Sequence, residues 1–125
     1  MIAIDTSALI SFLEGKEDKI SILTGSAIGE KRAVFPPVVL TDILSEPSLS
    51  KELREILNNI PLLRVRADFW KNAGLLRAKI LSKGLRARVA DALIAQSCID
   101  EDLTLLTQDR DFNHFEKYGG LKLLR

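Results

Sequence analysis

The chain has 125 residues, with 18 basic and 17 acidic side chains and a formal net charge of +1. This length suits one domain with one substantial core, and the 46% hydrophobic content is typical of a globular protein. The near-neutral balance excludes a uniformly basic nucleic-acid-binding chain, although local clusters of charge remain open.

Cys98 is the one cysteine, which excludes an internal disulfide framework and fits a reducing compartment. No segment approaches the roughly 20 apolar residues of a membrane span, and the N-terminal apolar stretch lacks the basic leader of a signal peptide. We therefore expect a cytoplasmic protein without a membrane segment, folded as a single domain over residues 1–125.

Short apolar, β-branched segments alternate with segments of helical periodicity along the chain. The pattern predicts strands over 2–4, 33–35, 62–65, 103–106 and 121–124, and helices over 8–13, 18–27, 38–44, 50–58, 67–83 and 88–99. Trp70, Ala73, Leu76, Ile80 and Leu81 recur at roughly helical spacing in the longest helix and predict its apolar face. Strands alternating with helices indicate an α/β domain with a parallel sheet covered on both faces.

Carboxylates stand next to apolar segments at Asp5, Asp42, Asp91 and the Asp109/Asp111 pair. Functional groups of a parallel sheet gather beyond the carboxyl ends of its strands, so these acids can converge from distant parts of the chain. Their mutual repulsion would be relieved by Mg²⁺ or Mn²⁺, hard cations that prefer oxygen ligands. A metal-bound water is a nucleophile suited to phosphodiester hydrolysis.

Each acid also has a purely structural interpretation. Asp5 can cap the helix that follows it, and Asp91 can stabilise its own helix through the helix dipole. Asp42 can be an exposed helix residue, and Asp109 with Asp111 can belong to an ordinary turn. The four sites taken together indicate a metal site more specifically than any one of these acids does alone.

Four segments, taken in order, resemble the PIN-domain nucleases and in particular the VapC-like ribonuclease toxins of toxin–antitoxin pairs. The stretches that carry the resemblance are Ile2-Ala3-Ile4-Asp5-Thr6-Ser7-Ala8-Leu9-Ile10, Pro36-Pro37-Val38-Val39-Leu40-Thr41-Asp42-Ile43-Leu44, Val89-Ala90-Asp91-Ala92-Leu93-Ile94-Ala95 and Leu105-Leu106-Thr107-Gln108-Asp109-Arg110-Asp111-Phe112. The resemblance implies a three-layer α/β/α fold with a mainly parallel sheet. It also implies a Mg²⁺- or Mn²⁺-dependent endoribonuclease, commonly a homodimer, that is blocked by a small antitoxin protein.

The resemblance implies catalytic roles for Asp5, Asp42, Asp91 and Asp109, with Asp111 as a further metal ligand or loop brace. The family usually has glutamate at the second acid, so Asp42 is a departure that shortens the reach of this carboxylate. Glu46 lies four residues later, and we prefer Asp42 for this position.

Two threonines and two arginines complete the predicted site. The hydroxyls of Thr6 and Thr107 can orient neighbouring carboxylates, as groups behind the metal ligands do elsewhere. Arg86 and Arg88, shortly before Asp91, are the first candidates for contacts with RNA phosphates. His114 is expected to have a surface or loop role.

Two other functions remain open at the level of sequence. A PIN-type nuclease could process RNA or act on structured DNA without an antitoxin. A non-catalytic, Mg²⁺-binding phosphoacceptor of the receiver type has a similar size and acid content, but it expects paired acids early in the chain and a lysine after a late strand. Here Asp5 stands alone and Gln108 follows Thr107.

Overall fold

The computed structural model describes residues 1–124, which form a four-stranded sheet and seven helices. The strands are β1 (Ile2–Ile4), β2 (Ala33–Val34), β3 (Thr104–Leu106) and β4 (Lys122–Leu123). The helices are α1 (Thr6–Leu13), α2 (Lys19–Gly29), α3 (Pro37–Leu44), α4 (Lys51–Asn58), α5 (Phe69–Leu81), α6 (Val89–Asp100) and α7 (Phe112–Gly119).

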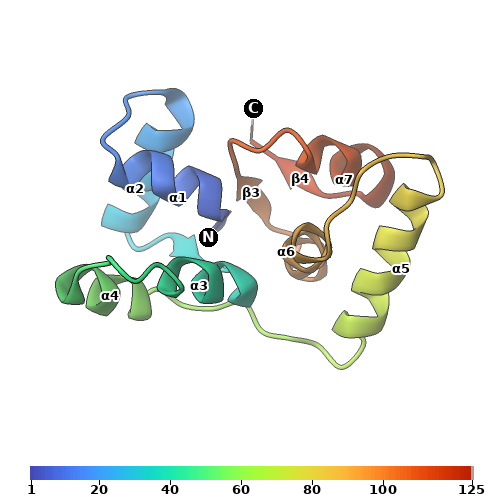
Figure 1. Cartoon of the computed structure of the whole chain (residues 1–125), viewed down its shortest axis with the longest axis horizontal. Helices are drawn as coiled ribbons and strands as arrows, with labels where there is room; N and C mark the ends of the chain where they lie inside the picture. Colours follow the sequence, from blue (N-terminus) through green and yellow to red (C-terminus); the bar gives the residue numbers. More distant parts are fainter. Residues whose placement is uncertain (125) are drawn as a thin grey trace.

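The strand order is β2-β1-β3-β4 and every pairing is parallel, so the predicted α/β fold with a parallel sheet is confirmed. Helices α1 and α2 lie on one side of the sheet, and α3 and α6 lie on the other (Figure 1). Helix α4 packs on α3, and α5 packs on α6 and α7. Ile4, Leu9, Phe35, Leu105 and Phe115 are among the fully buried side chains of the shared core.

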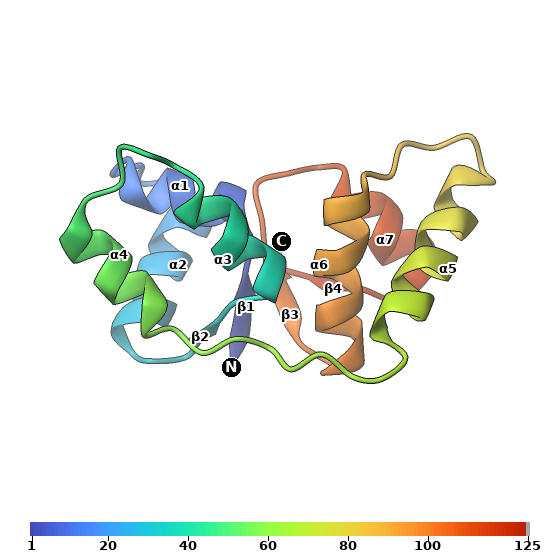
Figure 2. The same cartoon turned by 60° about the horizontal axis from the view of Figure 1, so that its bottom comes forward.

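The central position of β1 decides where the functional groups gather. Ala3 pairs with Val34 of β2 on one side and with Leu105 of β3 on the other. The backbone N–H of Asp5 donates to the carbonyl of Leu106 at 2.9 Å, so the residues that follow β1 and β3 are direct neighbours. In Figure 2 the N-terminal end of α6 lies at this same edge of the sheet.

Helix α7 was not among the predicted elements. Its sequence is mostly polar, and the spacing of its two buried aromatic residues, Phe112 and Phe115, is the only apolar signal within it. Gly120, with φ of 81°, ends the helix in a left-handed conformation that glycine adopts without steric cost.

Two further predictions for the middle of the chain are wrong. Residues 62–65 form no strand; a single parallel bridge joins Leu62 to Phe35. Trp70 and Leu81 do not belong to the buried face of their helix, because 64% and 43% of their surfaces are exposed, whereas Ala73, Leu76 and Ile80 are buried as expected. Trp70 lies edge-on to the buried ring of Phe69.

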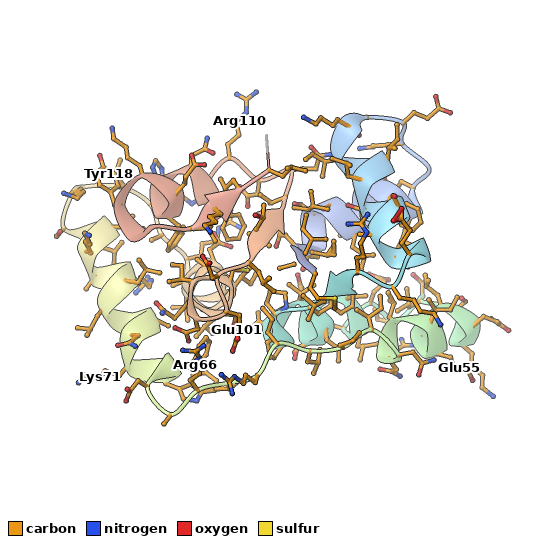
Figure 3. The ribbon with its side chains drawn as sticks, turned by 180° about the vertical axis from the view of Figure 1, so that it is seen from behind. Glu55, Arg66, Lys71, Glu101, Arg110 and Tyr118 are labelled. Atoms are coloured by element: carbon orange, nitrogen blue, oxygen red, sulfur yellow. The ribbon has the colours of Figure 1, made fainter. Side chains whose placement is uncertain are left out.

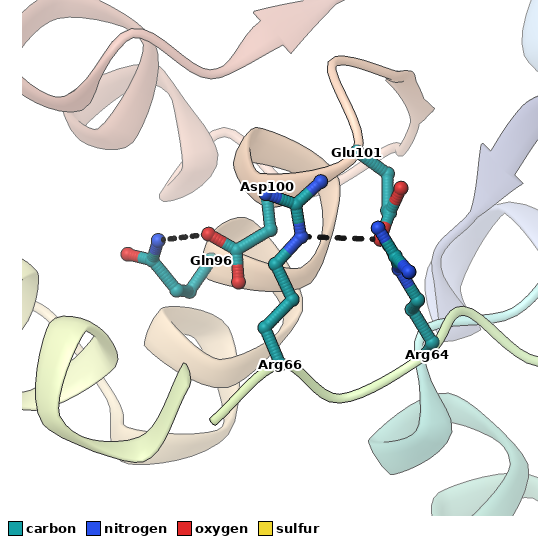
Figure 4. A network of polar contacts seen from close by, with 5 residues as sticks. All are labelled: Arg64, Arg66, Gln96, Asp100 and Glu101. Atoms are coloured by element: carbon teal, nitrogen blue, oxygen red, sulfur yellow. Dashed lines mark hydrogen bonds and ion pairs between the residues drawn. The ribbon is translucent and has the colours of Figure 1, made fainter. Parts of the chain in front are cut away.

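The long connection from α4 to α5 is tied to the C-terminal end of α6. Arg64 Nε and Arg66 Nε both reach Glu101 Oε1, at 2.8 and 3.5 Å (Figure 4). Figure 3 shows Arg66 and Glu101 in the whole molecule. Glu101 is ten residues beyond Asp91, and at 1.5 Å per helical residue this is about 15 Å along the helix. These two arginines therefore belong to the end of α6 that is remote from Asp91.

Candidate metal centre

A cleft of about 590 Å³ opens at the carboxyl edge of the sheet. Four predicted acids line it, each from a different part of the chain: Asp5 after β1, Asp42 on α3, Asp91 in the first turn of α6 and Asp109 after β3. The other lining residues include Thr6, Ser7, Ile10, Val38, Thr41, Ser45, Arg88, Ala90 and Ile94. The tertiary structure therefore brings together acids that are widely separated in sequence.

Two of these four acids, Asp91 and Asp109, form a tight group with Asp111, which does not itself line the cleft. Asp91, Asp109 and Asp111 each offer an oxygen within 4.8 Å of the other two. Asp91 Oδ2 is buried and has no hydrogen-bond partner among residues 1–124. A buried carboxylate oxygen without a partner is costly, and a hard divalent cation would satisfy it and neutralise the clustered charge. The donor set therefore fits a metal ion such as Mg²⁺ or Mn²⁺.

Asp5 is oriented by two hydroxyl groups that bind the same oxygen. Ser7 Oγ and Thr107 Oγ1 lie 2.7 and 2.8 Å from Asp5 Oδ2, and both hydrogen bonds are donated to the carboxylate. Asp5 occupies the N-cap position of α1 but makes no side-chain capping bond, so helix capping does not account for it. The two hydroxyl donors therefore converge on one oxygen, Oδ2, and fix the orientation of the carboxylate.

The loop that carries Asp109 is organised by its own side chains. The N–H of Asp109 donates to Thr107 Oγ1 at 3.0 Å, and the N–H of Asp111 donates to Asp109 Oδ1 at 2.9 Å. Gln108 donates its backbone N–H to Ser7 Oγ at 2.9 Å and its side-chain amide to Asp18 Oδ1 at 2.7 Å. These bonds fix one oxygen of Asp109 and link the loop to α1 and α2.

The electrostatics of the cleft disfavour several negative charges at once. Burial raises the pKa of Asp91 to about 6, and the charges of Asp109 and Asp5 add to this effect while Arg88 opposes it. Burial also raises the pKa of Asp5, against the hydrogen bonds from Ser7 and Thr107, which lower it. Burial is the main cause of both shifts, and neighbouring negative charge adds to it only for Asp91; buried carboxylates of this kind are common at metal and catalytic sites.

Two arginines form a basic rim beside the acids. Arg86 Nε and Arg88 Nη2 lie 3.8 and 4.0 Å from Asp111 Oδ2, and both side chains are largely exposed. Arg77 Nε donates to the carbonyl of Ala87 at 2.8 Å and so braces the backbone between them. The cleft thus has an acidic interior and a cationic edge.

Asp42 and Glu46 have different surroundings. Asp42 is exposed at the wall of the cleft. The Glu46 carboxylate accepts hydrogen bonds from the hydroxyl and the backbone N–H of Ser48, at 2.6 and 3.2 Å. Glu46 therefore serves the turn after α3, and Asp42 is the acid of this segment that the cleft contains.

Thr6 and Thr107 are the hydroxyl residues that the sequence predicts to orient the carboxylates. Ser7 was not included in this prediction, although it lies two positions after Asp5 and binds it. Thr6 lines the cleft, but its Oγ1 is buried and has no hydrogen-bond partner among residues 1–124. His114 lies half-buried on α7 and does not line the cleft.

The structure is that of a parallel α/β domain with an acidic cleft at the carboxyl edge of its sheet. The family model of the PIN domain matches residues 2–118, so the chain belongs to the PIN domain family. No curated protein sequence matches this chain.

Solved structures of the same fold match the chain over nearly its full length. A chain of VapBC2 from Rickettsia felis, bound to a promoter DNA fragment, is 22% identical, with a TM-score of 0.70 and coverage of 99% of this chain and 98% of that chain. VapBC-5 from Mycobacterium tuberculosis, a member of the VapBC family of toxin–antitoxin systems, is 20% identical, with a TM-score of 0.68 and coverage of 99% and 97%. DNA-bound VapBC from Salmonella typhimurium is 17% identical, with a TM-score of 0.72 and coverage of 99% and 98%. None of the helices within residues 1–124 has the length and apolar character that crossing a membrane requires.

Proposed function

We propose that this protein is a metal-dependent endoribonuclease and the toxin of a type II toxin–antitoxin pair. The observation that carries the proposal is the convergence of Asp5, Asp91 and Asp109 on one cleft, with Asp91 Oδ2 buried and unpartnered within residues 1–124. Membership of the PIN domain family and the likeness to VapBC structures support the same function.

In this proposal Asp91, Asp109 and Asp5 hold Mg²⁺ or Mn²⁺, with Asp111 and Asp42 as additional carboxylates. The bound metal would activate a water and stabilise charge on a phosphoryl oxygen. Ser7 and Thr107 hold Asp5 in one orientation through its Oδ2. Arg88 and Arg86, at the edge of the cleft, attract the RNA backbone and position a phosphate near the acids.

The proposed antitoxin would occupy an apolar groove that adjoins the cleft. This groove has a volume of about 500 Å³ and is lined by Thr6, Ile10, Leu13, Glu14, Asp42, Ile43, Ser45, Glu46 and Leu49. Thr6, Ile10, Asp42 and Ser45 line both the groove and the cleft. A segment bound in the groove would therefore lie at the entrance to the site. A small reading frame beside the gene would support this partner, and its absence would favour a PIN nuclease that acts in RNA processing or on structured DNA.

The test is cleavage of RNA by purified protein, free of any antitoxin, in the presence of Mg²⁺ or Mn²⁺. We expect cleavage that chelation abolishes and that an Asp5→Asn/Asp91→Asn double variant lacks. Asp102→Asn is the matched control, because Asp102 is an exposed carboxylate that pairs with Lys122 and does not line the cleft. Equal cleavage by the wild type and the double variant would exclude the assigned site.

The phosphoacceptor alternative has no support from the PIN domain match. Labelling of Asp5 or another acid of the cleft by acetyl phosphate would restore it.

A further inference from the structure

Gln108, in the loop that carries Asp109, joins this loop to two other segments of the chain. Gln108 makes two hydrogen bonds that point in different directions. Its backbone N–H donates to Ser7 Oγ, and its side-chain amide donates to Asp18 Oδ1, 90 residues away in sequence. One residue of the loop therefore joins both the start of α1 and the residue that begins α2.

The acceptor, Asp18, is exposed, as is Gln108, and its carboxylate is also hydrogen-bonded within the first turn of α2. It is the N-cap of α2, where Oδ1 accepts the Ser21 N–H at 3.0 Å and Oδ2 accepts the Ser21 hydroxyl at 3.1 Å. The hydrogen bond from the Ser21 N–H, with smaller contributions from Gln108 and the Ser21 hydroxyl, lowers the pKa of Asp18. The carboxylate is therefore ionised at neutral pH, and charge-assisted hydrogen bonds of this type are shorter and stronger than neutral ones.

The other end of the connection reaches the acids of the cleft. Ser7, which accepts from the Gln108 backbone, donates to Asp5 Oδ2. The next backbone N–H, that of Asp109, donates to Thr107 Oγ1, which also binds Asp5 Oδ2. A displacement of Gln108 would therefore move Asp109 and weaken the support of Asp5 together.

We infer that Gln108 and Asp18 form a positioning contact that anchors the loop of Asp109 to the N-terminus of α2 and thereby sets the distance between Asp109 and Asp5. Neither residue touches the reacting groups; both act through the two acids. The inference rests on the proposed metal site for its consequences in binding, but the anchoring itself is a property of the metal-free protein.

The experiment combines two substitutions that break the same contact from opposite sides. Gln108→Met removes the donor and keeps the length of the side chain. Asp18→Ser removes the acceptor for Gln108 but keeps a good N-cap for α2, because serine caps helices about as well as aspartate. Asp68→Ser is the matched control, since Asp68 is at the N-cap of α5 and makes no side-chain capping bond.

The first measurement is amide hydrogen exchange of the metal-free proteins. We expect the N–H groups of Gln108, Asp109 and Asp111 to exchange about threefold to tenfold faster in either variant, with no further increase in the double variant, since one hydrogen bond is removed in all three. Gln108→Lys should restore protection, because an ammonium group also donates to Asp18. Unchanged exchange in Gln108→Met, or additive effects in the double variant, would overturn the inference.

The second measurement is the affinity for Mn²⁺ by calorimetry. Both single variants should bind Mn²⁺ about threefold to tenfold more weakly, whereas Gln108→Lys and Asp68→Ser should show no comparable loss. Wild-type Mn²⁺ affinity in both single variants would also overturn the inference. If the wild type binds no Mn²⁺, the proposed function fails, and the exchange experiment still decides whether the anchor exists.

Discussion

Asp5 and Thr107 are 102 positions apart in sequence, yet Thr107 Oγ1 donates a hydrogen bond to Asp5 Oδ2 at 2.8 Å. The contact exists because β1 and β3 are adjacent parallel strands and both residues follow the last paired position of their strand. Thr107 also accepts the N–H of Asp109, so one hydroxyl connects two of the acids in the cleft.

Thr107→Val should remove both of these bonds without changing the shape of the side chain. We expect a decrease of about 1 kcal/mol in the free energy of unfolding, because Asp5 loses one of its donors, and a drop in RNA cleavage of about tenfold. Thr107→Ser retains the hydroxyl and should stay close to wild type. Thr104→Val, the same substitution on β3, is the control. An equal decrease in the stability and activity of this control would show that the effect comes from changing a threonine near this strand and not from losing the Thr107 hydroxyl.

The raised pKa of Asp91 predicts how stability depends on pH in the metal-free protein. The folded state favours the protonated carboxyl, so this contribution to stability is fully present below the ordinary pKa of 3.8 and is lost as pH rises to about 6 and above. Asp91→Asn imitates the protonated form at every pH. We therefore expect the free energy of unfolding of the variant, measured with urea, to rise relative to that of the wild type by about 1–2 kcal/mol between about pH 4 and about pH 7. This figure is reduced for solvent screening, because the cleft is open. A difference that does not change with pH would contradict this account.

Asp42 stands where the resemblance to the PIN-domain family implies a glutamate, and its side chain is one methylene shorter. Because it is exposed at the wall of the cleft, Asp42→Glu should lengthen its reach and strengthen Mn²⁺ binding by about threefold. Asp42→Asn should weaken binding less than Asp91→Asn does, since Asp91 belongs to the tight group with Asp109 and Asp111. Calorimetric titration with Mn²⁺ measures both effects, and a larger decrease for Asp42→Asn would reverse this ranking.

Arg86 and Arg88 are expected to bind RNA phosphates. Replacing either with alanine should weaken RNA binding and reduce the slope of log affinity against log salt by about one for each arginine replaced. Fluorescence anisotropy in the presence of EDTA separates this binding from cleavage. Arg64→Ala and Arg66→Ala are the matched controls, because these arginines pair with Glu101 at the far end of α6; a similar change of slope in the controls would contradict a role specific to the rim.

Trp70 and Val89 are exposed apolar side chains, by 64% and 58%, and both line a cavity between α5 and α6. If the homodimer that the family resemblance implies uses this surface, Trp70→Glu should shift the protein towards monomer, because a carboxylate is costly at a buried interface. Sedimentation velocity measures the shift. Trp70→Phe should preserve the dimer, and a dimer unaffected by Trp70→Glu would assign the interface to another surface.

Residue type and spacing predicted the secondary structure correctly where a segment's conformation depends mainly on its own residues. Ile2–Ile4 forms the expected strand because its residues are apolar and mostly β-branched. The helix predicted over 50–58 forms as α4, and Ser50 caps it by accepting the N–H of Leu53 on its Oγ. Local signals failed for α7, whose two buried aromatic residues are too few to show a period, and for Trp70, whose exposure depends on how α5 packs against its neighbours.

The sequence by itself determined which residue types were available: carboxylates beside apolar segments, in an order that resembles the PIN domains. The tertiary structure decided which of them meet. Strand order brought Asp5 next to Thr107, the packing of α6 buried Asp91 beside Asp109, and loop geometry gave Ser7 and Gln108 partners that sequence reasoning had not assigned to them. The physical reason is that the side-chain hydrogen bonds joining these segments and the pKa of Asp91 depend on distances across the fold, which no local pattern of residues encodes.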